Sequence, residues 1–364
     1  MKMDNRTETR SIYPVWALLP VLCLVVALLI GCNAGGERLI PGPELAATCN
    51  LLTLLPGQSP STNDNDADGI SDWVEDELAG RFAPVVKLHP GEQYLPADII
   101  WYLPRVRMRF DVNLRTDVQL LKKGEVDLSS LVTLANRGQL SGLSPDKTNF
   151  FLEQTDNHGG DVLDSYRKET RRGTDTGVCY VHVRPAPESH SGMYDIQNIF
   201  FYAYNLHTAQ GPVEASHEAD LEHITVRVES DRRTIHQIFY AAHDTEGKWY
   251  ASKTSPGAKN GYSLTGDGRP VVYSARGTHA SYPWEGQWVR GSGKPDDITR
   301  DGGMVWDCKV SLNNVGEKLH PREGMQWIQY SGRWGEMGEA SWTTGPYGPA
   351  YQDWWQSEPE LFKN

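Results

Sequence analysis

Short runs of alternating or β-branched residues, separated by turn residues, fill the chain from residue 81 onward. Successive side chains of an extended strand point to opposite faces, and Gly, Asn and Asp favour turns. The clearest predicted strands are 99–103, 106–112, 199–204, 221–228, 235–242, 271–274, 304–310 and 327–330. Regular turns without long helical patterns predict a mainly β fold, and more closely an antiparallel β-sandwich with a short N-terminal helix.

Two further segments, 117–121 and 128–134, fit either a short helix or a strand, and the pattern leaves both alternatives open. No internal repeat of fixed period is visible, so a repeat architecture is not expected.

The first 31 residues have a different pattern. Basic residues near the N-terminus precede an almost uncharged apolar run that ends directly before Cys32. This order is typical of an export signal, and the cysteine at its end resembles that of bacterial lipoprotein signals. We therefore expect a lipoprotein signal peptide at 1–31 and a lipidated Cys32 that anchors the chain to a membrane, outside the cytoplasm in the bacterial cell envelope. The alternative is an uncleaved membrane helix, because the apolar run is nearly long enough to span a bilayer.

Residues 32–63 are rich in Gly, Pro, Ala, Ser and Thr, which is typical of a flexible tether. The next segment, 64–75, has acidic residues at its positions 1, 3, 5, 9 and 12 and glycine at position 6. Calcium takes about six to eight oxygen ligands, and this spacing wraps carboxylates around one centre. We expect a structural calcium loop whose ligands are Asp64, Asp66, Asp68, Ile70, Asp72 and Glu75. The alternative is an Asp-rich polar linker.

The predicted calcium loop departs from an EF-hand at position 8, where Ser71 replaces the usual hydrophobic residue. It is more similar to the single calcium loops of thrombospondin type 3 repeats. With a short helix after it, the loop would occupy 64–80, and a β-sandwich domain would follow over 81–364.

Charge and cysteine content narrow the function classes. Lys and Arg number 35 against 47 Asp and Glu, a formal net charge of -12, and an acidic surface repels phosphate backbones, so no nucleic-acid partner is expected. The sequence has no CxxC pair, which excludes a thiolate zinc cluster of that kind. Beyond the signal and Cys32, three cysteines remain, Cys49, Cys179 and Cys308; they allow one disulfide, and the sequence does not choose the pair.

The segment 216–228 combines charge with a strand pattern. With a period of two, Asp220 and Glu222 share one face with Ile224, Val226 and Val228, whereas the opposite face is mostly polar. A carboxylate that faces a core is costly unless it is paired or bound to a metal. The pattern therefore indicates either a cation beside the two carboxylates or, as the alternative, pairing with arginines at a strand end.

Histidines could complete the cation site at Asp220 and Glu222, which would be the second such site after the calcium loop. His217 lies where the chain enters the strand, and we expect it to bind a divalent cation together with Asp220 and Glu222. Carboxylates favour Mg, Ca or Mn, and added imidazoles shift the preference toward Zn or Mn. His243 and His279 each follow a predicted strand and are the candidates for a catalytic base.

Three motifs in this order resemble the vacuolar protein sorting-associated protein 62 family. They are HxxDxEHIT at 217–225, the segment around His243, and PVVYSARGTHASYP at 270–283. The opening segment around 83–96 also looks like that family, and Leu221 departs from its pattern, which usually has Trp between the acidic pair. The resemblance carries no settled enzymatic activity.

More distantly, the spacing of His217, Asp220 and Glu222 is similar to the metal-binding heptapeptide of necrosis- and ethylene-inducing protein toxins. Those toxins are secreted β-sandwiches whose cation site helps them dock on sphingolipid headgroups. Ser216 stands here where their motif has glycine.

Three function classes fit these observations. The first is a membrane-anchored, metal-binding β-sandwich that binds a glycan or lipid headgroup, with Trp284 or Trp288 as contacts. The second is a metal-dependent hydrolase that uses a cation-activated water. The third is a structural surface protein. The sequence has no GxSxG, P-loop or HExxH motif, and it does not decide whether the protein is an enzyme.

Overall fold

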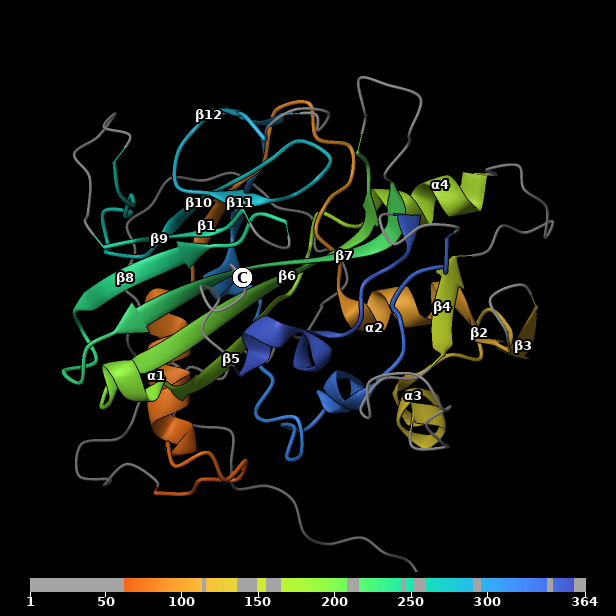
Figure 1. The fold of residues 1–364 in the computed structure, drawn as a ribbon, viewed down its shortest axis with the longest axis horizontal. Helices are drawn as coiled ribbons and strands as arrows, with labels where there is room; N and C mark the ends of the chain where they lie inside the picture. Colours follow the sequence, from red (N-terminus) through yellow and green to blue (C-terminus); the bar gives the residue numbers. More distant parts are fainter. Residues whose placement is uncertain are drawn as a thin grey trace, which may run out of the picture. The chain divides into compact units, whose positions relative to one another are not determined.

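A six-stranded sheet lies at the centre of the fold (Figure 1). Its order is β15 (Leu312–Asn314), β5 (Cys179–Pro185), β6 (Tyr194–Asn205), β7 (His217–Val228), β8 (Ile235–Tyr240) and β9 (Lys248–Tyr250). Neighbouring strands are antiparallel except β15 and β5, which run parallel. The long strands β6 and β7 pair along their whole length, and this pair positions the predicted second cation site.

The computed structural model describes residues 62–112, 116–135, 149–154, 165–207, 216–243, 246–251, 260–290, 296–338 and 343–356. All of them belong to one contact unit, Gly57–Asn364. The predicted signal peptide, Cys32, Cys49 and nearly all of the tether lie outside the described residues, so the expectations about them stay predictions. Within the described ranges, none of the helices has the length and apolar content needed to cross a bilayer.

A second sheet packs against one face of the central sheet. Its order is β11 (Ser281–Tyr282), β10 (Val271–Ser274), β1 (Val85–Lys87) and β14 (Val305–Asp307). Val86, Val272 and Trp306 of this sheet share a buried core with Ile196 and Phe200 of the central sheet. The predicted mainly β fold and sandwich are therefore confirmed, with β1 and β10 as a further parallel pair.

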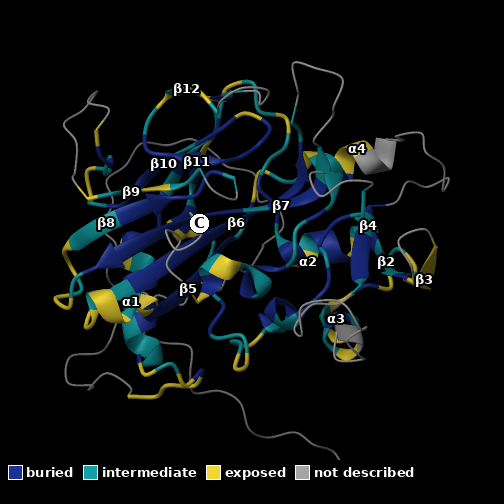
Figure 2. Ribbon diagram, in the orientation of Figure 1, coloured by how far each residue is buried: buried dark blue, intermediate teal, exposed yellow. Residues whose placement is uncertain are grey.

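The opposite face of the central sheet is also covered. Phe201 of β6 shares a second buried core with Tyr102, Leu152, Trp327 and Trp334. Smaller sheets complete the fold: β3 (Asp117–Leu121), β2 (Val106–Asp111) and β4 (Phe150–Gln154) form one, and β12 (Gly286–Trp288) and β13 (Asp297–Thr299) form the other. Figure 2 shows the central strands as mostly buried, so polar side chains on either face of β7 lie inside the protein.

The helices are short. They are α1 (Asp72–Phe82), α2 (Ile99–Tyr102), α3 (Leu128–Ala135) and α4 (Ser165–Arg172), with 3-10 turns η1 (Leu103–Arg105), η2 (Glu188–His190), η3 (Cys308–Val310), η4 (Gln326–Gln329), η6 (Pro349–Tyr351) and η7 (Asp353–Trp355). Helix α1 begins inside the predicted calcium loop, at Asp72, and buries Leu78 and Phe82 in the sandwich core. Of the two ambiguous segments, 117–121 is a strand and 128–134 lies in a helix.

Three predicted strands are corrected by the structure. Segment 99–103 forms α2 and the start of η1, because the Asp98 carboxylate accepts a hydrogen bond from the Ile100 amide at 2.9 Å and caps a helix. Segment 327–330 lies largely in η4, where the consecutive residues Trp327 and Ile328 are both buried. Segment 304–310 is a strand only over β14, and η3 follows it. The first two segments are short, largely apolar runs, for which burial in the tertiary fold outweighs strand propensity. In the third, the Asp307 carboxylate accepts a hydrogen bond from the Lys309 amide at 3.0 Å and caps η3.

The structure bears on the possible disulfide among the three remaining cysteines. Cys179 and Cys308 are both buried free thiols. Burial raises the pKa of the Cys308 thiol well above its ordinary value. Cys49 lies outside the described residues.

Candidate functional site

Strand β7 presents both predicted carboxylate ligands to the sandwich core. Asp220 lies opposite Tyr202 of β6, and Glu222 lies opposite Phe200. Phe200 and Tyr202 belong to the same buried core as Ile224. Asp220 and Glu222 therefore share a face with Ile224, as the alternation of side chains along the strand predicts. The exposed fractions of Asp220 and Glu222 are 6% and 8%, so each carboxylate needs a compensating partner.

The partner of Asp220 is His279, in the loop after β10. Its Nδ1–H donates to Asp220 Oδ2 at 2.9 Å, its Nε2 lies 3.8 Å from Glu92 Oε1, and Tyr202 stacks on the ring at 3.8 Å. Burial alone would lower the pKa of this imidazole, but the two carboxylates raise the pKa to about 9. The positive charge that faces Asp220 in this structure is therefore an imidazolium.

Glu92 was missed by the sequence analysis. Burial acts to raise its pKa, but contact with the His279 imidazolium and hydrogen bonds from the Gly277 and Tyr94 amides bring the pKa to about 2. Glu92 lies in the opening segment of the family resemblance, but its contact with His279 depends on the tertiary fold. Asp220, His279 and Glu92 form what we call the imidazolium cluster.

His243, three residues after β8, belongs to a different group. Its Nε2–H donates to Asp297 Oδ2 at 2.7 Å, and Asp297 also accepts from Tyr282 Oη at 2.6 Å and Thr278 Oγ1 at 2.7 Å. Burial would raise the pKa of Asp297, but these hydrogen bonds hold the pKa below its ordinary value. We call His243 and Asp297 the imidazole–carboxylate pair. Asp297 was also missed, because nothing local distinguishes it from a surface acid.

His217 is half-buried, and its Nδ1–H donates to the Ala219 carbonyl at 2.7 Å. Among the described residues, two groups of three or more His, Cys, Asp or Glu have ligand atoms within 4.8 Å of one another, and both lie in the 64–75 loop. His217, Asp220 and Glu222 therefore share one end of β7 without forming such a group in this structure.

The backbone at this end of the sheet is strained. Ala219, His243 and His279 have φ values of 56°, 51° and 57°, in the left-handed region that non-glycine residues rarely adopt. Such conformations cost roughly 1–3 kcal/mol each and persist where the surrounding structure holds them in place. Their gathering beside Asp220 and Asp297 is typical of a functional site.

An aromatic pocket of about 530 Å³ adjoins the imidazole–carboxylate pair. It is lined by Lys248, Trp249, Tyr250, Ala251, Asn260, Trp284 and Trp288. Trp288 stacks on Tyr282 at 4.2 Å, and the Tyr282 hydroxyl donates to Asp297, so one tyrosine connects the pocket to the pair. Of the lining residues, the sequence predicts only Trp284 and Trp288 as contacts.

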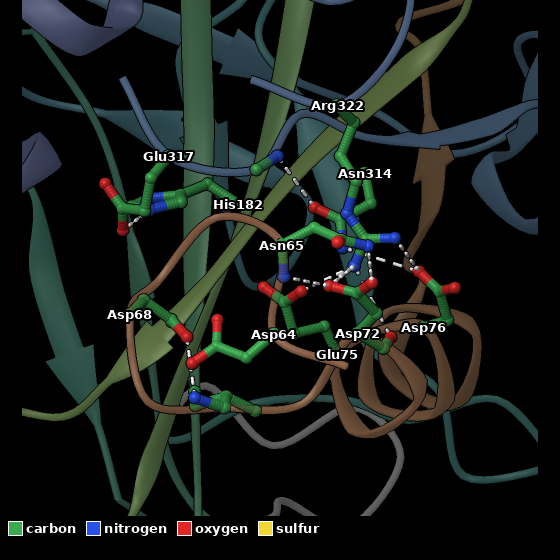
Figure 3. Close-up of polar contacts among 12 residues, drawn as sticks. Asp64, Asn65, Asp68, Asp72, Glu75, Asp76, His182, Asn314, Glu317 and Arg322 are labelled. Atoms are coloured by element: carbon green, nitrogen blue, oxygen red, sulfur yellow. Dashed lines mark hydrogen bonds and ion pairs between the residues drawn. The ribbon is translucent and has the colours of Figure 1, made fainter. Parts of the chain in front are cut away.

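The predicted calcium loop gathers its acidic side chains, as Figure 3 shows. Asp64, Asp66 and Asp68 form one close group, and Asp66, Asp72 and Glu75 form the other. Burial and neighbouring carboxylates raise the pKa of Asp66 to about 6 and that of Glu75 to about 9, against the opposing effect of Arg322. These side chains can supply the oxygen ligands of a hard divalent cation.

With the fold and the sites described, the chain can be classed as a β-sandwich with an acid- and imidazole-rich end. The sequence pattern of the vacuolar protein sorting-associated protein 62 family matches residues 74–340, well over half of the chain. The chain belongs to this family, which confirms the resemblance predicted from the sequence.

Two yeast relatives are similar over much of the chain. Vacuolar protein sorting-associated protein 62 of Saccharomyces cerevisiae is 26% identical over 326 residues, which cover 79% of this chain and 65% of the yeast protein. The vacuolar protein sorting-associated protein TDA6 of the same yeast is 25% identical over 293 residues, which cover 70% of this chain and 59% of that protein. The chain thus spans less than two thirds of each relative.

Two solved structures show a remote likeness. Necrosis and Ethylene inducing Protein 2, from the causal agent of cocoa's Witches Broom disease, is 14% identical with a TM-score of 0.26, over 65% of this chain and 72% of that chain. NLPPya in complex with mannosamine is 13% identical with a TM-score of 0.32, over 81% of this chain and 90% of that chain.

Proposed function

We propose that this protein is an extracytoplasmic binding module, held at a membrane through Cys32, that binds a glycan or the headgroup of a lipid. The ligand would occupy the aromatic pocket, and a divalent cation held by His217, Asp220 and Glu222 would order the neighbouring loops. The observation that carries the proposal is the position of the pocket, which Tyr282 joins to the imidazole–carboxylate pair.

The pocket has the chemistry that sugar binding needs. Trp284 lies 5.0 Å from Trp288 and 5.5 Å from Tyr250 between ring centroids, so the pocket offers several aromatic faces for the C–H groups of a sugar ring. Lys248 and Asn260 add polar groups that can bind hydroxyl or charged substituents. Its volume of about 530 Å³ lies within the range of pockets that hold small ligands.

The proposed cation is supported by the burial of two carboxylates at the same strand end. His279 offsets only one of these two charges, that of Asp220, and the buried charge of Glu222 lies close enough to Tyr282 to raise the pKa of that phenol. The strained conformations of Ala219, His243 and His279 indicate that this end of the sheet is organised for a purpose other than packing.

A metal-dependent hydrolase is the second candidate, and the imidazole–carboxylate pair favours it. Asp297 fixes the orientation of the His243 ring, which is what a general base requires. In this alternative, His243 would take a proton from a water molecule that attacks the bound glycan or phosphoester.

The test is to titrate the full chain, purified in detergent, with neutral and amino monosaccharides and with glycolipid vesicles, in calcium and in EDTA. Replacing Trp284 with Ala should weaken binding about fivefold, because an aromatic stacking contact contributes roughly 1 kcal/mol. Trp101→Ala, at a half-buried tryptophan outside the pocket, is the matched control and should bind as wild type.

The other outcomes separate the proposals. Loss of binding in EDTA and in Glu222→Gln supports the cation, whereas binding unaffected by both removes the cation from the proposal and leaves the pocket. Release of sugar or phosphate that stops in His243→Gln favours the hydrolase. Equal affinities of wild type and Trp284→Ala for every ligand would contradict the binding site.

A further inference from the structure

The 64–75 loop is folded around a centre by hydrogen bonds from its backbone amides to its own carboxylates. The Asp64 carboxylate accepts from the Ala67 amide at 2.8 Å and the Gly69 amide at 3.0 Å, and Asp68 accepts from the Ile70 amide at 2.7 Å. Ala67 and Gly69 have φ values of 64° and 92°, the left-handed conformation that a tight turn needs. Figure 3 shows the acidic side chains of this turn grouped beside the start of α1.

Several oxygens at the centre of the loop have no hydrogen-bond partner. Asp66 is 3% exposed and Glu75 is 0% exposed, yet both carboxylate oxygens of Asp66 and the Oε1 of Glu75 are buried without a partner. Asp66 belongs to both close acidic groups of the loop. Buried carboxylate oxygens in this state carry a large desolvation cost, which a bound cation would offset.

Arg322 alone cannot neutralise the buried carboxylates of this loop. Its Nη2–H donates to Glu75 Oε2 at 2.5 Å and to the Asp72 carbonyl at 3.4 Å, which leaves Glu75 Oε1 and Asp66 unsatisfied. A single guanidinium charge also faces the carboxylates of Asp72, Glu75 and Asp76 at once.

We propose that the 64–75 loop binds one calcium ion centred on Asp66 and Glu75, and that this ion fastens α1 to the body of the protein. Asp64, Asp68 and Asp72 complete the acidic ligand set, with the Ile70 carbonyl at the position where such loops use the backbone. Glu75 divides its carboxylate, giving Oε1 to the ion and Oε2 to Arg322. Oxygen ligands in a flexible loop favour calcium over magnesium, which demands stricter octahedral geometry.

The ion would act on the packing of the sandwich. Ile70, Leu78 and Phe82 all belong to the core that the central and second sheets share. Arg322 follows β15, at the edge of the central sheet, so the ion, Glu75 and Arg322 would link the loop to that edge. The ion therefore has a structural role, independent of the proposed ligand site at the end of β7.

The experiment uses the full chain, purified in detergent, and titrates it with Ca²⁺ by calorimetry. A second readout is terbium luminescence sensitised by Trp73, which lies inside the loop. Asp66→Asn keeps the side chain's shape and removes its charge, and we expect it to weaken calcium binding at this site by a factor of about 100. Asp76→Asn is the matched control: it lies beside the loop, contacts Arg322 and is outside the ligand set, so it should bind as wild type.

The melting temperature, measured with and without calcium, distinguishes a calcium ligand from an aspartate that only stabilises the fold. Without calcium, Asp66→Asn should be at least as stable as wild type, since it removes a buried charge without a partner. With saturating calcium, wild type should rise in melting temperature and Asp66→Asn should not.

Asp220→Asn separates this ion from the one proposed at β7, because it should leave the terbium signal of the loop unchanged. Three results would overturn the loop site: no calcium bound to wild type at millimolar concentration, equal calcium binding in Asp66→Asn, or a variant less stable than wild type in EDTA.

Discussion

At the residue scale, two buried histidines, His223 and His279, show that the surroundings of an imidazole decide whether it carries a charge. Glu222 and His223 are neighbours in the sequence but face different cores: Glu222 pairs opposite Phe200, whereas His223 stacks on Trp354 at 4.0 Å. His279 is charged because carboxylates surround it, while burial without a charged partner lowers the pKa of His223 to about 3.

His223 should therefore make the fold sensitive to acid. As the pH falls below the ordinary value of 6.5, the unfolded chain takes up a proton that the folded imidazole does not, so the free energy of unfolding decreases until about pH 3. His223→Phe keeps an aromatic ring against Trp354 and removes this effect. Between pH 6 and pH 5, wild type should lose about 1 kcal/mol more stability than the variant, measured by urea denaturation. Parallel pH profiles of the two proteins would contradict the assignment.

At the element scale, both faces of the central sheet are buried. The polar side chains of β7 therefore lie against the protein interior and not in solvent. Arg227 is fully buried, and its Nε–H and Nη2–H donate to the two oxygens of Asp195 on β6 at 2.7 Å and 2.9 Å. The guanidinium also lies over the Trp249 ring at 4.6 Å. The sequence pattern identified this face as polar, and the ion pair across the strands is what allows it to be covered.

Breaking that pair should be costly. Arg227→Met leaves the Asp195 carboxylate without its main partner inside the protein, and we expect a loss of about 3–5 kcal/mol in the free energy of unfolding. Arg81→Met is the control, because it removes the same side chain from an exposed pair with Glu77 on α1 and should cost less than about 1 kcal/mol. Chemical denaturation of both variants measures the difference. Similar losses in the two would show that the buried pair contributes no more than a surface one.

At the scale of the whole molecule, the proposed function requires attachment to a membrane, which depends on Cys32. Expressed in a bacterium with a radiolabelled fatty acid, wild type should incorporate label and partition into the membrane fraction, whereas Cys32→Ser should do neither. Cys49→Ser controls for labelling of another cysteine near the N-terminus. Label retained in Cys32→Ser would reject the lipoprotein signal, and membrane association without label would favour the uncleaved helix.

The sequence could predict features that depend on neighbouring residues. Strand periodicity identified β6, β7 and β10 and placed Asp220 on the core face with Ile224, because the alternation of side chains is a local property of the backbone. The spacing of acids in 64–75 likewise identified the group around Asp66, because one loop supplies all of its members.

Only the tertiary structure could decide which distant residues meet. It brought Glu92 to His279 and Asp297 to His243, joined Trp249 and Tyr250 to the aromatic pocket, and buried Trp327 and Ile328 in a 3-10 turn. Each of these depends on contacts between segments far apart in the sequence, and no local pattern encodes which segments will pack together. The same contacts decided that an imidazolium, supplied by the chain itself, lies beside Asp220.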